Sequence, residues 1–126
     1  MSFPFEIGTD IVNVRRMQQA IERQGRRFLD RIFTPDEQRY CETKRNKYEN
    51  YAARFAAKEA LIKAKGGGKG RYHFRGIEVK RNLFGKPYLS FTSDARRSLA
   101  ISSRAEFLLT MAHEREFATA TVVMKP

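Results

Sequence analysis

The spacing of hydrophobic residues differs from one part of the chain to another: alternation with polar residues predicts a strand, and a spacing of three to four residues predicts a helix. Residues 5–12 are β-forming residues with an alternating pattern, which predicts a strand. Asn13 follows at a position suited to cap a helix, and Met17 and Ile21 lie four residues apart, as on the inner face of that helix. Gly25 is the expected end of this first helix.

Two further helices are predicted in the first half of the chain, separated from the first by a short apolar turn at 28–33. Thr34 as cap, Pro35 at the first position and Glu37 three residues after the cap form the pattern of a helix start. The longest predicted helix covers residues 48–65, with apolar side chains at helical spacing at Tyr48, Tyr51, Ala52, Phe55 and Ile62. We expect this helix to be the centre of the fold.

The second half of the chain is mainly of β type. A glycine-rich run ends the long helix, and strands are predicted at 74–81, 87–92, 107–112 and 117–124, the last two as a hairpin. Residues 93–102 predict a short helix with Asp94 in its first turn. Because helices and strands mix without a regular βαβ rhythm, we expect a single α+β domain over residues 1–126.

Charge is the strongest feature of the composition and indicates an acidic partner. The chain has 25 Lys and Arg against 14 Asp and Glu, a net charge of +11. Nucleic acid, an anionic membrane face, an acidic protein and a polyphosphate ligand are all compatible with this charge. No apolar run approaches the roughly 20 residues of a membrane helix, and the first residues do not form a secretory signal, so we expect a cytoplasmic protein. Cys41 is the only cysteine, which excludes an internal disulfide and makes a zinc site unexpected.

Two carboxylates occupy positions where carboxylates are uncommon. Asp10 interrupts the first strand, and Glu59 lies four residues after Phe55 and three before Ile62, inside the apolar stripe of the long helix. A charge there must be paired or bound to metal. Two carboxylates on rigid elements suit Mg²⁺, which completes its coordination with water and substrate phosphate. The alternative is a structural ion pair, such as Glu59 with Lys63.

Two other features are compatible with phosphate binding. Lys63 precedes the run Lys-Gly-Gly-Gly-Lys-Gly at 65–70, whose backbone amides and lysines suit phosphate oxygens, although a plain helix stop explains the run equally well. The run is not a Walker loop, because the required lysine and hydroxyl spacing is missing. His113 at the tip of the last hairpin suits a phosphate partner or proton carrier, or is an ordinary solvated turn histidine.

Taken together, these residues resemble bacterial holo-acyl-carrier-protein synthase, the small type of 4′-phosphopantetheinyl transferase, over almost the whole chain. The most specific match is Arg-Phe-Ala-Ala-Lys-Glu-Ala-Leu-Ile-Lys-Ala at 54–64, which is similar to the family signature R-[FW]-[AS]-x-K-E-[AS]-x-x-K. The strand motif G-x-D-[IL] corresponds to Gly-Thr-Asp-Ile at 8–11. Supporting matches lie at 28–35, 76–79, 85–87 and 110–113.

The resemblance implies a fold in which a mixed or antiparallel sheet wraps one long central helix. It also implies transfer of the 4′-phosphopantetheine group of coenzyme A to a serine of apo acyl carrier protein, with release of adenosine 3′,5′-bisphosphate, as in the supply of carriers for fatty acid biosynthesis. The partners are then coenzyme A, Mg²⁺ and the carrier protein, with neither nucleic acid nor membrane. A homotrimer with active sites between subunits is implied as well.

The same resemblance assigns roles to individual residues. Asp10 and Glu59 hold Mg²⁺, and Glu59, Lys63 and His113 are catalytic, with Glu59 the first choice as proton acceptor. The coenzyme A contacts are Arg54, Lys63, Gly66, Gly67, Gly68, Lys86, Pro87 and His113. By the resemblance, the basic first helix with Arg16 meets the carrier protein. The excess of cations over residues 13–31 extends the predicted docking surface to Arg23, Arg27 and Phe28; a solvated basic face explains the arginines equally well, and Phe28 is alternatively a core residue.

The chain departs from the family pattern at two places. Ala112 stands immediately before His113 where the family commonly has Ser or Thr, and Thr110 stands where Ser is usual, so one hydroxyl contact to substrate is missing. The glycine run has Gly-Gly-Gly-Lys where Gly-Thr-Gly-[IL] is typical, so Lys69 adds a positive charge beside the ligand.

A small basic nucleic-acid-binding protein without catalysis is the alternative from another class. It explains the net charge, but it does not explain Glu59 in an apolar stripe. The chain also lacks the aromatic RNP pattern and the zinc-finger spacing of such proteins.

Overall fold

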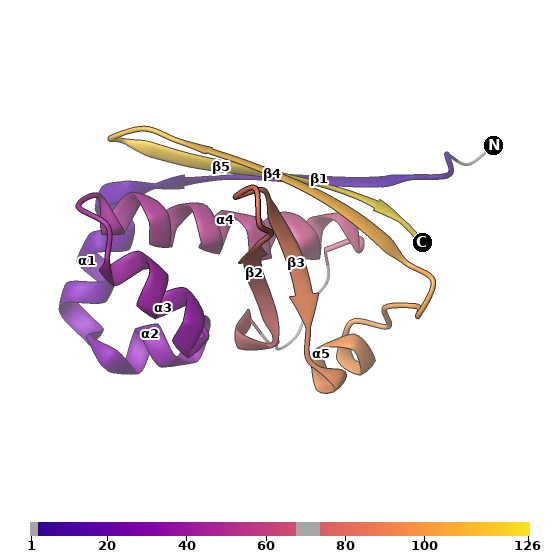
Figure 1. Cartoon of the computed structure of the whole chain (residues 1–126), viewed down its shortest axis with the longest axis horizontal. Coiled ribbons are helices and arrows are strands. Elements are labelled where there is room, and N and C mark those ends of the chain that lie inside the picture. The colour runs from indigo at the N-terminus through magenta and orange to yellow at the C-terminus, as the bar shows by residue number, and fades with distance from the viewer. Residues whose placement is uncertain (1–2, 68–73) are drawn as a thin grey trace.

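Two antiparallel sheets pack against one long helix in the computed structural model, which describes residues 3–67 and 74–126 (Figure 1). The three-stranded sheet has the order β1-β5-β4, and β2 pairs with β3 in the second sheet. The helices and strands are β1 Glu6–Asn13, α1 Val14–Gln24, α2 Arg26–Ile32, α3 Pro35–Glu42, α4 Lys47–Ala64, β2 Ile77–Arg81, β3 Pro87–Phe91, α5 Ser93–Ser98, β4 Glu106–His113 and β5 Phe117–Lys125, with a 3₁₀ turn η1 at Phe74–Gly76. Within these described residues, no helix has both the length and the apolar character needed to cross a membrane.

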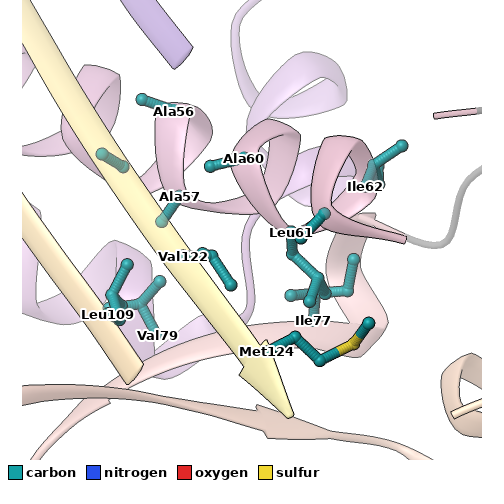
Figure 2. Packing of buried hydrophobic residues seen from close by; sticks show 12 residues of the cluster. Ala56, Ala57, Ala60, Leu61, Ile62, Ile77, Val79, Leu109, Val122 and Met124 are labelled. Carbon is teal, nitrogen blue, oxygen red and sulfur yellow. The ribbon is translucent and has the colours of Figure 1, made fainter. Parts of the chain in front are cut away.

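The predicted α+β class and the central long helix are confirmed, but the helix is buried on more than one face. Its alanines at 52, 53, 56, 57, 60 and 64 are all buried, so both sheets approach it closely. Figure 2 shows Ala57 and Leu61 of α4 beside Val122 of β5 and Ile77 of β2. A single apolar stripe was too narrow a prediction, because the sheets and the other helices contact different faces of α4.

Strand β1 passes very close to helix α4 at Gly8. A Cβ atom at this position would lie 1.9 Å from the carbonyl oxygen of Ala60 and 2.6 Å from the amide nitrogen of Ala64. Only glycine therefore allows β1 to cross α4 at this distance. The close crossing brings Asp10, two residues further along β1 and on the same face, beside the last turns of α4.

Local capping signals were predicted correctly. Asn13 accepts a hydrogen bond from the amide of Arg16 at 3.0 Å, and Thr34 and Glu37 form a complete capping box. Gly25, with a φ of 61°, ends α1 as expected.

The expected apolar turn at 28–33 is wrong, because residues 26–32 form helix α2. Leu29 and Ile32 are buried on its inner face, and Gly25 separates it from α1. A helix of seven residues is too short for its periodicity to be distinguished from an apolar turn in sequence, and tertiary packing decides its conformation.

Within residues 3–67 and 74–126, no helix covers the outer face of the three-stranded sheet, and the central rows of this face carry no charge. Cross-strand neighbours form the rows Ile7–Val123–Leu108, Thr9–Thr121–Thr110 and Ile11–Thr119–Ala112. Ile7 and Leu108 are 69% and 63% exposed. In Figure 1 the sheet lies over α4, and its opposite side is bare.

Candidate functional site

Asp10, Glu59 and Lys63 lie together where β1 passes the last turns of α4. The Nζ of Lys63 is 3.1 Å from Oδ1 of Asp10, and this pair is partly exposed. Glu59 is one turn before Lys63 and is half-buried. The alternative to a metal site was a structural ion pair between Glu59 and Lys63. Lys63 instead pairs with Asp10, and no ion pair joins Glu59 to Lys63 within the described residues.

Burial raises the pKa of Glu59, the nearby Asp10 carboxylate raises it further, and Lys63 opposes the shift. A cation bound between the two carboxylates would offset both effects. Two hard oxygen donors fit Mg²⁺, which takes one or two protein carboxylates and fills its remaining positions with water and phosphate. Among the residues described, no cluster of three or more His, Cys, Asp and Glu is placed to hold a metal ion.

A groove of about 500 Å³ runs from the two carboxylates toward helix α1. Its charged residues are Asp10, Glu59 and Arg16, and its apolar wall includes Phe28 and Phe55. The groove thus joins the predicted metal ligands to two of the four residues predicted to dock a carrier protein. The other two, Arg23 and Arg27, are exposed but do not line it.

Arg54 lies on the other side of α4, in a second pocket of about 320 Å³ that also includes Tyr40, Arg81 and Tyr88. Arg54 is only 2% exposed, and its guanidinium lies 4.2 Å from the centre of the Tyr40 ring. Its Nη1 donates to the carbonyl of Asn50 at 3.3 Å, whereas its buried Nε has no hydrogen-bond partner in the described part of the chain. A buried arginine with an unused donor beside a pocket can bind an anion.

His113 is the last residue of β4, directly before the turn that joins β4 to β5. Its Nδ1 is 2.8 Å from Oε1 of Glu49 in the first turn of α4. Glu49 and Glu59 are ten residues apart, so His113 lies roughly 15 Å along the helix from Glu59. One copy of the chain therefore does not bring His113 to the Asp10–Lys63 pair.

Arg54 and Lys63 are also separated within one copy. They are nine residues apart on α4, and at about 100° per residue their side chains leave opposite sides of the helix. The residues predicted to contact coenzyme A are therefore spread over one copy: Lys63 lies beside Asp10, Arg54 lies on the opposite side of α4, and His113 lies beside the first turn of that helix.

The glycines after α4 end the helix. Gly66 and Gly67 have φ values of 103° and 72°, which favour glycine. Their amides donate to the carbonyls of Lys63 and Ile62 at 3.0 and 2.8 Å, so these two donors are already used inside the protein. The predicted Gly68 contact and Lys69 lie outside the described residues.

Lys86 and Pro87 lie where the turn between β2 and β3 ends. The Lys86 amide donates to Oδ1 of Asn82 at 3.0 Å, and Pro87 pairs with Arg81 at the start of β3. Because Arg81 and the neighbouring Tyr88 line the Arg54 pocket, this turn lies at the edge of that pocket.

Sequence reasoning missed the buried pair Lys58–Glu37, whose side chains are both 0% exposed. The available signal was the position of Lys58, four residues after Arg54 and three before Leu61, on a buried side of α4. The capping pattern drew attention to Glu37 only as a helix-start residue.

Comparisons with known proteins agree on one family. The family model described as the 4′-phosphopantetheinyl transferase superfamily matches residues 6–122. Holo-[acyl-carrier-protein] synthase of Halothermothrix orenii is 44% identical over 117 residues, covering 93% of this chain and 94% of the relative. The corresponding synthase of Cytophaga hutchinsonii is 43% identical over 120 residues, covering 93% and 94%.

Solved structures with coenzyme A are similar over nearly the whole chain. The Chronobacterium ammoniagenes ACPS–CoA complex has a TM-score of 0.83 at 29% identity and covers 96% of both chains. Helicobacter pylori holo-[acyl-carrier-protein] synthase with coenzyme A has a TM-score of 0.79 at 28% identity, covering 94% of this chain and 98% of that chain.

Proposed function

Since the chain belongs to the 4′-phosphopantetheinyl transferase superfamily, among its holo-[acyl-carrier-protein] synthases, we propose that Mg²⁺-dependent transfer at the Asp10–Glu59 groove is its reaction. The 4′-phosphopantetheine group of coenzyme A passes to a serine of apo acyl carrier protein, and adenosine 3′,5′-bisphosphate leaves. Such carriers serve fatty acid biosynthesis in the cytoplasm. Membership of a transferase family argues against the alternative of a noncatalytic nucleic-acid-binding protein.

One observation carries this proposal. Asp10 of β1 and Glu59 of α4 line a groove whose walls include Arg16 and Phe28, and Lys63 of α4 lies beside Asp10. The carboxylates suit a metal that bridges to phosphate, and the arginine suits an acidic protein partner.

The chemistry follows from the charges of these residues. The serine hydroxyl attacks the β-phosphorus of coenzyme A, a new P–O bond forms, and the bond to the bridging diphosphate oxygen breaks. When bound by Asp10 and Glu59, Mg²⁺ would stabilise the negative charge that accumulates on the diphosphate. Lys63 lies beside Asp10 and can exchange this partner for a phosphate oxygen.

The hydroxyl proton needs an acceptor near the groove. Glu59 is suited to this role, directly or through water, because its half-buried carboxylate lines the groove beside Asp10. Its position in the groove with Arg16 and Phe28 supports contact with an incoming carrier serine.

The separation of these residues within one copy supports an active site that is shared between copies of the chain. Arg54 and the 85–87 turn can contact the nucleotide end of coenzyme A, and His113 can contact the phosphates, while Asp10, Glu59 and Lys63 of another copy bind the diphosphate. The outer face of the β1-β5-β4 sheet is suited to self-association, because its exposed apolar side chains, such as Ile7 and Leu108, would be removed from water between copies. By family resemblance the assembly is a homotrimer.

The direct test mixes the protein with coenzyme A, Mg²⁺ and apo acyl carrier protein and measures the mass of the carrier. We expect a mass increase equal to one phosphopantetheine group and an equal amount of adenosine 3′,5′-bisphosphate. Excess chelator should stop the reaction, and added Mg²⁺ should restore it. An unmodified carrier would refute the transfer, and full activity in chelator would refute the metal requirement.

A further inference from the structure

Lys58 belongs to the family signature but does not face the groove. Its ammonium group is completely buried and donates three hydrogen bonds, to the carbonyl of Ile32 at 2.8 Å, to Oε1 of Glu37 at 2.7 Å and to the carbonyl of Phe74 at 2.9 Å. An ammonium group has three donors, so all of them are used within the protein. Lys58 therefore has no free donor for a substrate.

Glu37 extends this network to further elements. Its Oε1 also accepts from the amide of Thr34 at 2.9 Å, and its Oε2 accepts from the amide of Val79 at 2.8 Å. The pair thus connects α4 with the end of α2, the start of α3, the 3₁₀ turn η1 and strand β2.

The hydrogen bonds of Lys58 and Glu37 involve elements that line the Asp10–Glu59 groove and the Arg54 pocket. Ile32 ends helix α2, which carries Phe28 into the wall of the Asp10–Glu59 groove. Glu37 and Val79 themselves line the Arg54 pocket. A buried ion pair contributes little stability compared with apolar residues of similar volume, so stability alone does not account for two buried charges here.

We propose that Lys58 and Glu37 are positioning residues, which fix α2 and β2 against α4 and so set the geometry of the groove and the Arg54 pocket together. The inference rests on the proposed function, in which the groove receives the carrier serine and the Arg54 pocket receives the nucleotide end of coenzyme A. Lys58 and Glu59 are neighbours in the signature but have different roles. Glu59 lines the groove, whereas Lys58 bonds to the end of α2, the helix that places Phe28 in the groove wall.

The test removes both charges while keeping the side-chain volumes. The double variant Lys58→Met with Glu37→Gln avoids the unpaired buried Glu37 that Lys58→Met alone would leave. We expect it to fold, yet to lose about 10- to 100-fold in kcat/KM for the carrier and for coenzyme A, because a displacement of about 1 Å in a catalytic site has effects of this size. Its Kd for coenzyme A, measured by calorimetry, should rise in parallel.

Lys47→Met is the matched control, since Lys47 forms an exposed ion pair with Glu42 between the same two helices, α3 and α4. This control should keep the parent kinetic constants. Parent-like kinetic constants and coenzyme A affinity in the folded double variant would overturn the positioning role and leave the proposed function intact. A parent protein that fails to modify the carrier would instead refute the proposed function.

If the double variant is unfolded at the assay temperature, Glu37→Gln alone decides the question. This variant can keep the Oε1 acceptor that Lys58 and the Thr34 amide share, but its amide nitrogen replaces the Oε2 acceptor of the Val79 amide. A raised Kd for coenzyme A at unchanged circular dichroism supports the proposal, and a parent Kd contradicts it.

Discussion

Glu59 is the residue at which the requirements of folding and of catalysis conflict most clearly. Burial and the Asp10 carboxylate raise its pKa, so the folded protein binds a proton at Glu59 more tightly than the unfolded chain does. Between the ordinary glutamate pKa and this raised value, the native state holds more protons. Stability therefore falls as pH rises through that interval.

Glu59→Gln should separate these two effects. At pH 7 the variant should have a higher thermal midpoint than the parent, because it removes a carboxylate that is costly to ionise, and at pH 4 the difference should shrink. Transfer should fall by about 100-fold or more, since a metal ligand and proton acceptor is lost. Thermal melts at both pH values and the carrier mass assay measure the two effects.

Glu22→Gln, at an exposed position on α1, is the control and should change neither property. An unchanged thermal midpoint for Glu59→Gln at pH 7, or transfer at the parent rate, would contradict this account of Glu59.

At the scale of single elements, the end of α5 contains a backbone conformation that disfavours its residue. Ala100 has a φ of 53°, and the amides of Ala100 and Ile101 donate to the carbonyls of Arg97 and Arg96 at 3.2 and 2.8 Å. These bonds form a Schellman motif, in which glycine usually occupies the position of Ala100.

Ala100→Gly is therefore expected to stabilise the protein by up to about 1 kcal/mol, because relief of the left-handed conformation outweighs the added freedom of the unfolded chain. Urea unfolding measures the change. Ala105→Gly, at a position without a positive φ, should destabilise it. A loss of stability in Ala100→Gly would show that the motif tolerates alanine without strain.

The crossing of β1 and α4 gives the opposite prediction for Gly8. Gly8→Ala places a methyl group against backbone atoms of Ala60 and Ala64, which cannot move as a flexible side chain can. We expect a destabilisation of about 3 kcal/mol and a lower kcat, since Asp10 must move with the strand. Glu6→Ala, an exposed change on the same strand, is the control for both measurements. Parent-like stability and kcat would mean that β1 accommodates the methyl group elsewhere.

At the scale of the whole molecule, the outer sheet face predicts self-association. Ile7→Glu with Leu108→Glu introduces two charges into one cross-strand row. Light scattering after gel filtration should give a mass near 14.7 kDa for this variant and three times that value for the parent. Transfer should be lost with the assembly.

Ser98→Glu is the control, because Ser98 is exposed on helix α5, outside this sheet and outside the residues proposed to bind either substrate. Its mass and activity should equal those of the parent. A monomeric parent that still modifies the carrier would contradict the shared active site.

The basic face of α1 predicts how the carrier binds. Arg16→Glu with Arg23→Glu should raise KM for the carrier, leave KM for coenzyme A nearly unchanged and weaken the salt dependence of the carrier KM. Arg97→Glu with Arg104→Glu makes the same charge change near α5, at the other end of the molecule (Figure 1), and should have a smaller effect. Equal losses toward both substrates would place carrier docking elsewhere.

The sequence by itself determined the features that depend on neighbours along the chain. Asn13, Thr34 and Gly25 mark helix ends through bonds or φ values within a few residues, so their roles were readable without a structure. The signature at 54–64 and the strand motif at 8–11 identified the family for the same reason, since each lies within one element.

Tertiary structure decided every feature that joins distant segments. Lys63 pairs with Asp10 across 53 residues, Lys58 with Glu37 across 21, and His113 with Glu49 across 64. Helix periodicity predicted that a charge in an apolar stripe needs a partner, but the partner depends on which elements pack around α4. The seven-residue helix α2 was missed for the same physical reason: so short a helix is stabilised mainly by packing against the rest of the fold.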